Sequence, residues 1–220
     1  MQTRAAFSAV VFPVPVGYRL SPMNTPRVRH LLLFASLTSV LGAASAPSAA
    51  SASRVPLFDG KSLAGWTVLK CEAEVRDGQV LIKAGNGLVQ TEKKYGDFVL
   101  EFEWKALQAD KWDSGVYFRY DTVPTNRPWP ARYQANLRQG EEGNVGGLKG
   151  AQSKGLFKDR EWNRLKLTVR GTKAALEVNG RPAWEADGLE GPREGFIALQ
   201  SEVPAGGQHL FRNIFITELK

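Results

Sequence analysis

The sequence predicts an all-β protein, a sandwich of two antiparallel sheets, and three observations support this class. After residue 55 the apolar residues recur with a period of two, and Gly or Pro interrupts the pattern about every ten residues. No segment carries a helical apolar stripe of about ten residues or more. The chain has 220 residues, 43% of them hydrophobic, which suffices for one large core. We therefore expect a single domain over residues 53–220.

The strand positions follow from the alternation. In 96–107, the clearest strand, Phe98, Leu100, Phe102 and Trp104 alternate with smaller or charged residues. Two dipeptides predict tight hairpin turns, because both of their positions tolerate positive φ: Asp77-Gly78 and Asn179-Gly180. Further strands are expected at 115–121, 132–138, 164–170, 174–178, 195–201 and 210–219.

Two long loops flank the short predicted strand 132–138. Residues 121–131 include three prolines, which cannot donate to a strand ladder, and one tryptophan, Trp129. Residues 140–150 are rich in glycine. Loops of this length in a compact sandwich usually carry function. We therefore expect a ligand site beside this strand.

The first 52 residues have the layout of a secretory signal peptide. Residues 24–30 carry positive charge, and residues 31–42 form an uncharged apolar run that is shorter than the roughly 20 residues needed to span a bilayer. Small residues follow, with an Ala-x-Ala site directly before Ser53. The sequence thus predicts export to the periplasm or the medium, with Met23 a candidate start. An uncleaved membrane anchor is the alternative.

The charge balance argues against a nucleic-acid partner. The formal net charge is +7, but four arginines lie in the first 52 residues, which contain no Asp or Glu. The remainder has 25 basic and 22 acidic residues, a net charge of +3, without a block of like charges to follow a phosphate backbone. Membrane contact is expected only through the signal peptide.

Cysteine and histidine are too scarce for several kinds of site. Cys71 is the only cysteine, which excludes an intrachain disulfide and a cysteine-based zinc site. The histidines are His30, within the predicted leader, and His209, so a two-histidine metal site is excluded from the mature domain. We expect His209 to be a surface residue of a hairpin rather than a proton-transfer group.

Several segments, taken in order along the chain, resemble the motifs of one family, the 3-keto-disaccharide hydrolase domain, also described as a 3-keto-glucoside lyase or hydratase domain. The segments are Leu57–Trp66, Asp77–Val80, Tyr95–Trp104, Asp113–Arg119, Tyr133–Leu137, Glu161–Asn163, Val178–Gly180 and Phe211–Ile214. The resemblance implies a concanavalin-like jelly roll that binds ligands on its concave face.

The resemblance also implies an exported enzyme that acts on glycosides already oxidised at C3 of the sugar. A 3-keto group acidifies the C2 hydrogen, so a base can remove it and the glycosidic oxygen at C1 can leave; water then adds back. Such a site needs a base, a donor or cation for the developing oxyanion, and polar groups for the hydroxyls. A divalent metal bound by carboxylate and amide oxygens is compatible with the sequence but is not indicated by any spacing.

Glu101 and Glu103 are the first candidates for acid–base work. They lie on one face of the strand 96–107, roughly 6.6 Å apart at about 3.3 Å per residue. Glu103 matches an acidic position of the family strand and is our candidate base, with Glu101 a ligand-binding group. The alternative is a solvated stripe of charges paired with neighbouring basic residues.

Two cations are candidates for the oxyanion. Arg119 lies on the polar parity of its strand and has a guanidinium whose fork geometry suits a keto or hydroxyl oxygen. Its alternative role is an ion pair with Glu103. Lys149, in the glycine-rich loop, is expected either over the pocket or free in solvent.

Amides and aromatic rings are expected to bind the sugar. Gln134 and Asn136 share one face and each offers a donor and an acceptor, while Tyr117 and Trp129 are expected to line the same pocket. Many relatives carry a carboxylate at one of the two amide positions, which this chain lacks, so the acid is expected to shift to Glu141 or Glu142. Three other tryptophans are assigned to packing: Trp66, Trp104 and Trp162.

The sequence analysis thus favours an enzyme that cleaves or hydrates 3-keto-glycosides, with a sugar or glycoside as its ligand. A carbohydrate-binding module without catalysis is the main alternative, because the same face would bind sugar without a base. An ordinary glycoside hydrolase, for which a carboxylate pair would suffice, is the third.

Overall fold

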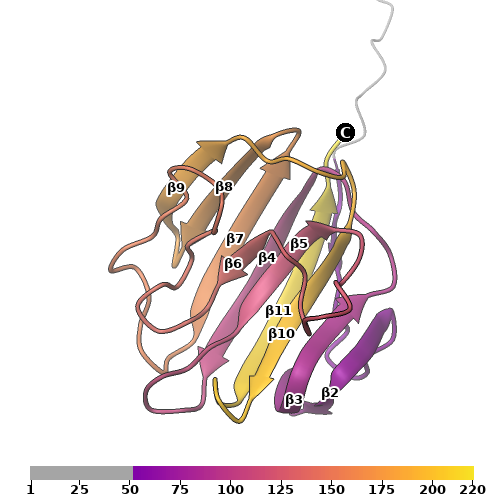
Figure 1. The fold of residues 1–220 in the computed structure, drawn as a ribbon, viewed down its shortest axis with the longest axis vertical. Coiled ribbons are helices and arrows are strands. Elements are labelled where there is room, and N and C mark those ends of the chain that lie inside the picture. Colours follow the sequence, from indigo (N-terminus) through magenta and orange to yellow (C-terminus); the bar gives the residue numbers. More distant parts are fainter. Residues whose placement is uncertain (1–51) are drawn as a thin grey trace, which may run out of the picture. The chain divides into compact units, whose positions relative to one another are not determined.

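The structure is a computed structural model that describes residues 52–220, which form eleven strands and no helix (Figure 1). All pairings are antiparallel. The predicted leader lies outside the described residues, apart from its last residue. The strands are β1 (Arg54–Pro56), β2 (Trp66–Arg76), β3 (Gln79–Thr91), β4 (Phe98–Ala106), β5 (Gly115–Tyr120), β6 (Gln134–Asn136), β7 (Asn163–Arg170), β8 (Lys173–Val178), β9 (Arg181–Asp187), β10 (Phe196–Val203) and β11 (His209–Glu218).

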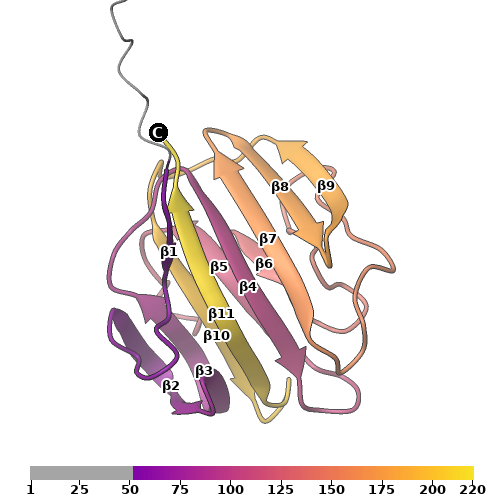
Figure 2. The same cartoon turned by 180° about the vertical axis from the view of Figure 1, so that it is seen from behind.

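The strands form one ladder in the order β6-β5-β10-β3-β11-β4-β7-β8-β9, which curls into two layers. Strand β3 belongs to both layers. Its residues 80–82 pair with β11, and its residues 85–90 pair with β10. The layer of β3, β10, β5 and β6 is called here the β10 layer, and the layer of β11, β4, β7, β8 and β9 the β4 layer. Figure 2 shows the β4 layer with β1 beside β11.

Glycines allow the β2–β3 hairpin to bend from one layer to the other. The register between the two strands shifts near Cys71. A Cβ on Gly87 would lie 1.9 Å from the carbonyl oxygen of Leu69, and one on Gly85 would lie 2.8 Å from the Cα of Cys71. Because only glycine permits this approach, the Gly-Asn-Gly segment at 85–87 is a structural bend.

The main core fills the space between the layers. The inward residues of β4 are the alternating large side chains from Phe98 to Trp104, which pack against β5 and β10 through Phe118, Ile197 and Leu199. A second, smaller apolar cluster lies on the other side of the β10 layer and contains Leu88, Tyr117, Tyr120 and Ala198. The β10 layer is therefore covered on both faces, with part of its outer face left polar.

Fold class and both hairpin turns agree with the sequence predictions. The described residues form a curled antiparallel jelly roll, and the Asp77-Gly78 and Asn179-Gly180 turns have positive φ at both positions. The predicted strand at 132–138 is shorter than expected, since only Gln134–Asn136 is paired with β5. Among residues 52–220, no helix is long and apolar enough to cross a membrane.

Candidate functional site

A row of polar side chains crosses the outer face of the β10 layer. Antiparallel partners point to the same side of a sheet, and the register sets Gln134 opposite Tyr117, and Gln90 opposite Ala198. Gln200, two residues beyond Ala198 on β10, points to the same side of the sheet. This polar face, as it is called below, consists of Gln90, Gln134, Asn136, Gln200 and Glu202.

Three residues of the polar face form a chain of hydrogen bonds. Gln134 Nε2 donates to Gln200 Oε1, and Gln200 Nε2 donates to Glu202 Oε2 at 3.0 Å. A Cβ on Gly115 would lie 2.0 Å from Gln134 Nε2, so any larger residue there would displace the Gln134 side chain. Beside this chain, Asn136 Nδ2 donates to Glu141 Oε2 at 3.2 Å.

Two carboxylates lie at one end of the chain. Glu202 and Asp113 line a cavity of about 380 Å³ together with Arg138 and Trp112. Burial raises the pKa of Glu202, and the charge of Asp113 raises it further. Burial also raises the pKa of Asp113, although Arg138, whose Nε is 3.7 Å from Asp113 Oδ2, lowers it. Carboxyl groups with raised pKa values in a cavity are typical of acid–base sites.

The loops predicted to be functional form two walls of this face. Trp129, from the loop between β5 and β6, packs on the smaller apolar cluster, and its Nε1 donates to the carbonyl of Ser201 at 3.2 Å. Tyr117 lies beside it, and burial raises its pKa to about 12, so the phenol stays protonated. On the other side, the glycine-rich loop and Asn136 enclose a depression of about 610 Å³ that is lined by Lys149 and Glu141. Of the sequence-predicted residues, Gln134 and Asn136 thus lie on the polar face, with Tyr117, Trp129 and Lys149 beside it.

Arg119 does not belong to this site, and its predicted ion pair with Glu103 is wrong. The register between β5 and β10 shifts after Tyr117, and Arg119 has a φ of 54°. This bulge breaks the alternation on which the prediction depended. The buried guanidinium instead donates to Asp97 Oδ1 at 2.7 Å, to the Gly96 carbonyl at 3.0 Å and to the Gly171 carbonyl at 3.2 Å.

Glu101 and Glu103 lie on the outer face of the β4 layer, away from the amides, so the predicted shared pocket is wrong. Glu103 Oε2 accepts from Arg212 Nε at 2.7 Å. Glu101 accepts from Arg54 and, at 2.7 Å, from Arg164. The alternation of β4 correctly paired the two glutamates, but the core between the layers separates them from β6. They match the alternative of a charged stripe with basic partners.

His209 is buried rather than exposed, which corrects the surface assignment. Its Nδ1 accepts from Trp104 Nε1 at 3.1 Å, so its Nε2 carries the proton and donates to the carbonyls of Gly206, at 3.0 Å, and Asp113, at 3.1 Å. Burial lowers its pKa to about 4. The neutral ring thereby anchors the segment that carries Asp113.

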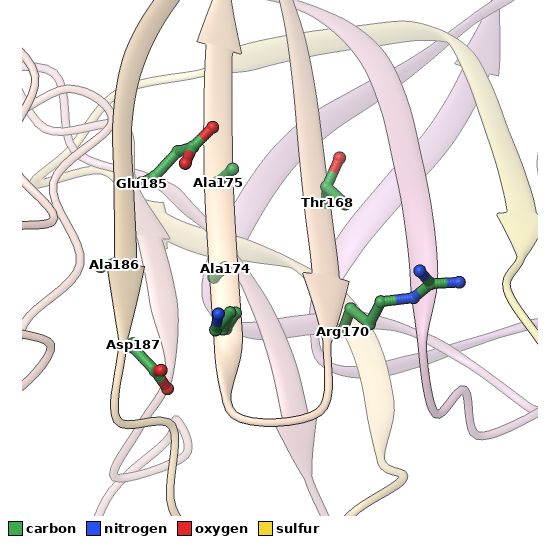
Figure 3. A pocket seen from close by; sticks show the side chains of 8 residues that line it. Thr168, Arg170, Ala174, Ala175, Glu185, Ala186 and Asp187 are labelled. Carbon is green, nitrogen blue, oxygen red and sulfur yellow. The ribbon is translucent and has the colours of Figure 1, made fainter.

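A separate depression on the outer face of β7, β8 and β9 differs from the polar face in its lining residues. Thr168, Ala175 and Glu185 form one row across the three strands (Figure 3). Asp187 at its rim accepts from Thr172 Oγ1 at 2.6 Å, which lowers the pKa of that carboxyl. The pKa of Asp187 is therefore shifted in the opposite direction to the pKa values of Glu202 and Asp113. Within residues 52–220, no group of three or more His, Cys, Asp or Glu side chains is placed to hold a metal ion.

The sequence analysis missed five polar residues of the site: Gln90, Asp113, Arg138, Gln200 and Glu202. Gln200 and Glu202 stand two apart on β10, as Gln134 and Asn136 do on β6, so the same parity argument would have found them. Asp113 lies in a segment that carried the family resemblance but received no role. Arg138 has the same parity as Gln134 and Asn136 in the predicted strand 132–138, so that argument would have included it too, although β6 ends at Asn136.

Comparison with known proteins defines the family. Residues 53–217 match the 3-keto-alpha-glucoside-1,2-lyase-like domain, and the chain belongs to this family. The resemblance drawn from the sequence motifs is thereby confirmed. No curated protein matches the chain.

Solved structures agree on the fold. A Parabacteroides distasonis protein described provisionally as a glycosyl hydrolase is 22% identical, with a TM-score of 0.61 over 76% of this chain and 100% of that one. A second protein so described from the same organism is 17% identical, with a TM-score of 0.60 over 76% and 94%. The carbohydrate-binding module CBM66 of Bacillus subtilis is 17% identical, with a TM-score of 0.55 over 70% and 96%. Family and fold together indicate a carbohydrate-related domain.

Proposed function

We propose that the protein is an enzyme that cleaves 3-keto-glycosides at the polar face, by proton removal at C2 and elimination at C1, followed by addition of water. The observation that carries the proposal is the pair Glu202 and Asp113, two carboxyl groups with raised pKa values in one cavity beside Arg138. A carboxylate with a raised pKa is a stronger base. It is suited to removing the C2 proton, which the 3-keto group of the substrate makes more acidic.

Each residue of the cavity has a distinct part in this proposal. Glu202 removes the C2 proton with Oε1, since Oε2 already accepts from Gln200. The Arg138 guanidinium stabilises the negative charge that develops on the ketone oxygen. Asp113, which lies in the same cavity, acts as the acid and protonates the leaving glycosidic oxygen. Glu202 thus supplies the carboxylate that the family resemblance leads one to expect at Gln134 or Asn136.

A matched pair of variants tests the base. Glu202→Gln should reduce turnover of a methyl 3-keto-glucoside by about 10² to 10⁴, the usual contribution of a general base, and should largely spare binding. Glu103→Gln, on the other layer, is the control and should keep wild-type turnover. Equal losses in both variants, or none in either, would refute this assignment.

Sugar binding without catalysis is the second candidate function. The neutral amides of Gln134, Gln200 and Asn136 favour it, because they suit hydroxyl groups and need no chemistry. Binding of a methyl glucoside or its 3-keto form, without turnover of either, would establish this alternative. Turnover of the unoxidised glucoside would instead indicate an ordinary glycoside hydrolase.

We further propose that the enzyme is exported. The charged segment, the apolar run and the small residues before Ser53 support this. N-terminal sequencing of the protein from its native host should give a chain that begins near Ser53 in the periplasm or medium. A full-length chain in the cytoplasm would contradict export.

A further inference from the structure

The direction of the amide chain on the polar face follows from its end group. An ionised carboxylate only accepts hydrogen bonds, so Gln200 must turn its Nε2 toward Glu202. Its Oε1 then faces Gln134, which must turn its own Nε2 toward Gln200. The carboxylate therefore fixes the orientation of each amide. Without it, the oxygen and nitrogen of each amide could exchange places by a flip of the group.

The end of the chain remains open to a ligand. In the described part of the protein, Gln134 Oε1 accepts no hydrogen bond from another side chain or the backbone, and it is not among the buried unsatisfied atoms. The amide nitrogen rests over Gly115, which holds the group flat against the strand. Gln134 thus presents the acceptor Oε1 at the surface of the site, while its Nε2 donates to Gln200.

We infer that the Glu202–Gln200–Gln134 chain determines specificity, by requiring the ligand to place a hydroxyl donor, and not the ketone oxygen, against Gln134 Oε1. A ketone oxygen is an acceptor only, and two acceptors facing each other repel. The ketone must therefore lie toward Arg138, at the other end of the chain. This inference rests on the proposed function for the nature of the ligand, but the direction of the amides does not.

The direction is measured without any ligand. In NMR spectra recorded at pH 8, the side-chain NH₂ protons of Gln134 should show nuclear Overhauser contacts to the α protons of Gly115. Couplings across hydrogen bonds should run from Gln134 Nε2 to the Gln200 amide carbon, and from Gln200 Nε2 to the Glu202 carboxyl carbon. Couplings in the reverse direction, from Gln200 Nε2 to the Gln134 amide carbon, would overturn the inference.

Gln200→Met breaks the chain and leaves Glu202 in place. The Gln134 amide then loses its fixed partner, so the contact with Gly115 should weaken. Gln79→Met, at the start of β3 and directly before the residues of that strand that pair with β11, is the matched control and should leave the Gln134 signals unchanged. An unchanged Gln134 contact in Gln200→Met would show that the chain does not orient it.

The ligand requirement is tested with methyl glucosides in which one hydroxyl at a time is replaced by fluorine, which accepts but cannot donate. At one position the fluoro compound should bind the wild type roughly tenfold more weakly than the parent, about the value of one hydrogen bond. In Gln200→Met the penalty should shrink, because the freed amide can turn its Nε2 outward. Equal penalties in both proteins would overturn the specificity role, whereas absence of binding of both the methyl glucosides and the methyl 3-keto-glucoside would reject the proposed function and leave the NMR result on amide direction standing.

Discussion

Arg119 has the geometry of a structural residue. Its three acceptors come from the segment before β4 and from the turn between β7 and β8, so one guanidinium joins parts of the chain that are distant in sequence. Asp97 also accepts from the Gly171 backbone nitrogen at 2.9 Å, which closes the network. A buried ion pair with these additional hydrogen bonds orders the structure around it.

We therefore expect Arg119→Ala to lower the free energy of unfolding by about 1.5 to 3 kcal/mol, the usual contribution of a hydrogen bond to a charged group, because Asp97 is only partly buried. Arg164→Ala removes an exposed partner of Glu101 and should cost no more than about 1 kcal/mol. Urea unfolding of both variants measures the difference. If Arg119→Ala were as stable as Arg164→Ala but bound sugar poorly, the structural role would be wrong.

His209 should make stability depend on pH. Its folded pKa is about 4 and therefore lies below its unfolded value of about 6.5, so the unfolded chain binds a proton that the folded protein excludes. Stability from this group is present above pH 6.5 and falls by about 3 kcal/mol as the pH decreases to 4.

The variant His209→Gln isolates this effect, since carboxyl groups elsewhere titrate in both proteins. Urea unfolding between pH 4 and 7 should give a steeper slope of stability against pH in the wild type than in His209→Gln. Parallel slopes would show that the buried imidazole is not the group that titrates.

At the scale of elements, alternation predicted the strands well and predicted the site in part. Period-two patterns located β4, β5, β7 and β11, because each strand has one face in the core. Alternation also placed Gln134 and Asn136 together correctly. It failed at Arg119, since a one-residue bulge reverses every later side chain and leaves no mark in the composition.

The sequence pattern did not predict which of the two layers each strand joins. Glu103 and Gln134 each lie on the outward side of a strand, and parity alone does not say which layer a strand joins. The answer depends on the bend in β3, where residues 80–82 pair with β11 and residues 85–90 with β10. The sequence analysis assigned no role to the glycines at 85 and 87, which permit that bend.

We expect Gly87→Ala to disturb the bend, because the added Cβ would overlap the carbonyl oxygen of Leu69. Overpacking of this kind lowers the free energy of unfolding by about 1 to 3 kcal/mol. Gly146→Ala is the control, since its Cβ would meet nothing within 4 Å. Thermal unfolding compares the two, and equal stabilities would mean that the close approach is not required.

On the scale of the whole domain, the two layers carry different kinds of polar surface. The outer face of the β4 layer pairs its carboxylates with arginines, as Glu103 does with Arg212. On the polar face the carboxylates Glu202 and Asp113 instead share a cavity, and their pKa values are raised. Paired charges suit a solvated surface, whereas perturbed carboxyl groups beside amides suit the binding and chemistry of a sugar.

Proton removal at C2 is the central claim, and one measurement tests it directly. A methyl 3-keto-glucoside is converted by the protein in deuterium oxide, and the product is analysed by NMR against a reaction without protein. The account predicts deuterium at C2 of the product, because the proton taken by Glu202 exchanges with solvent before C2 is protonated again. A product that forms only when the protein is present and retains its original hydrogen at C2 would contradict the account. It would indicate direct hydrolysis at C1.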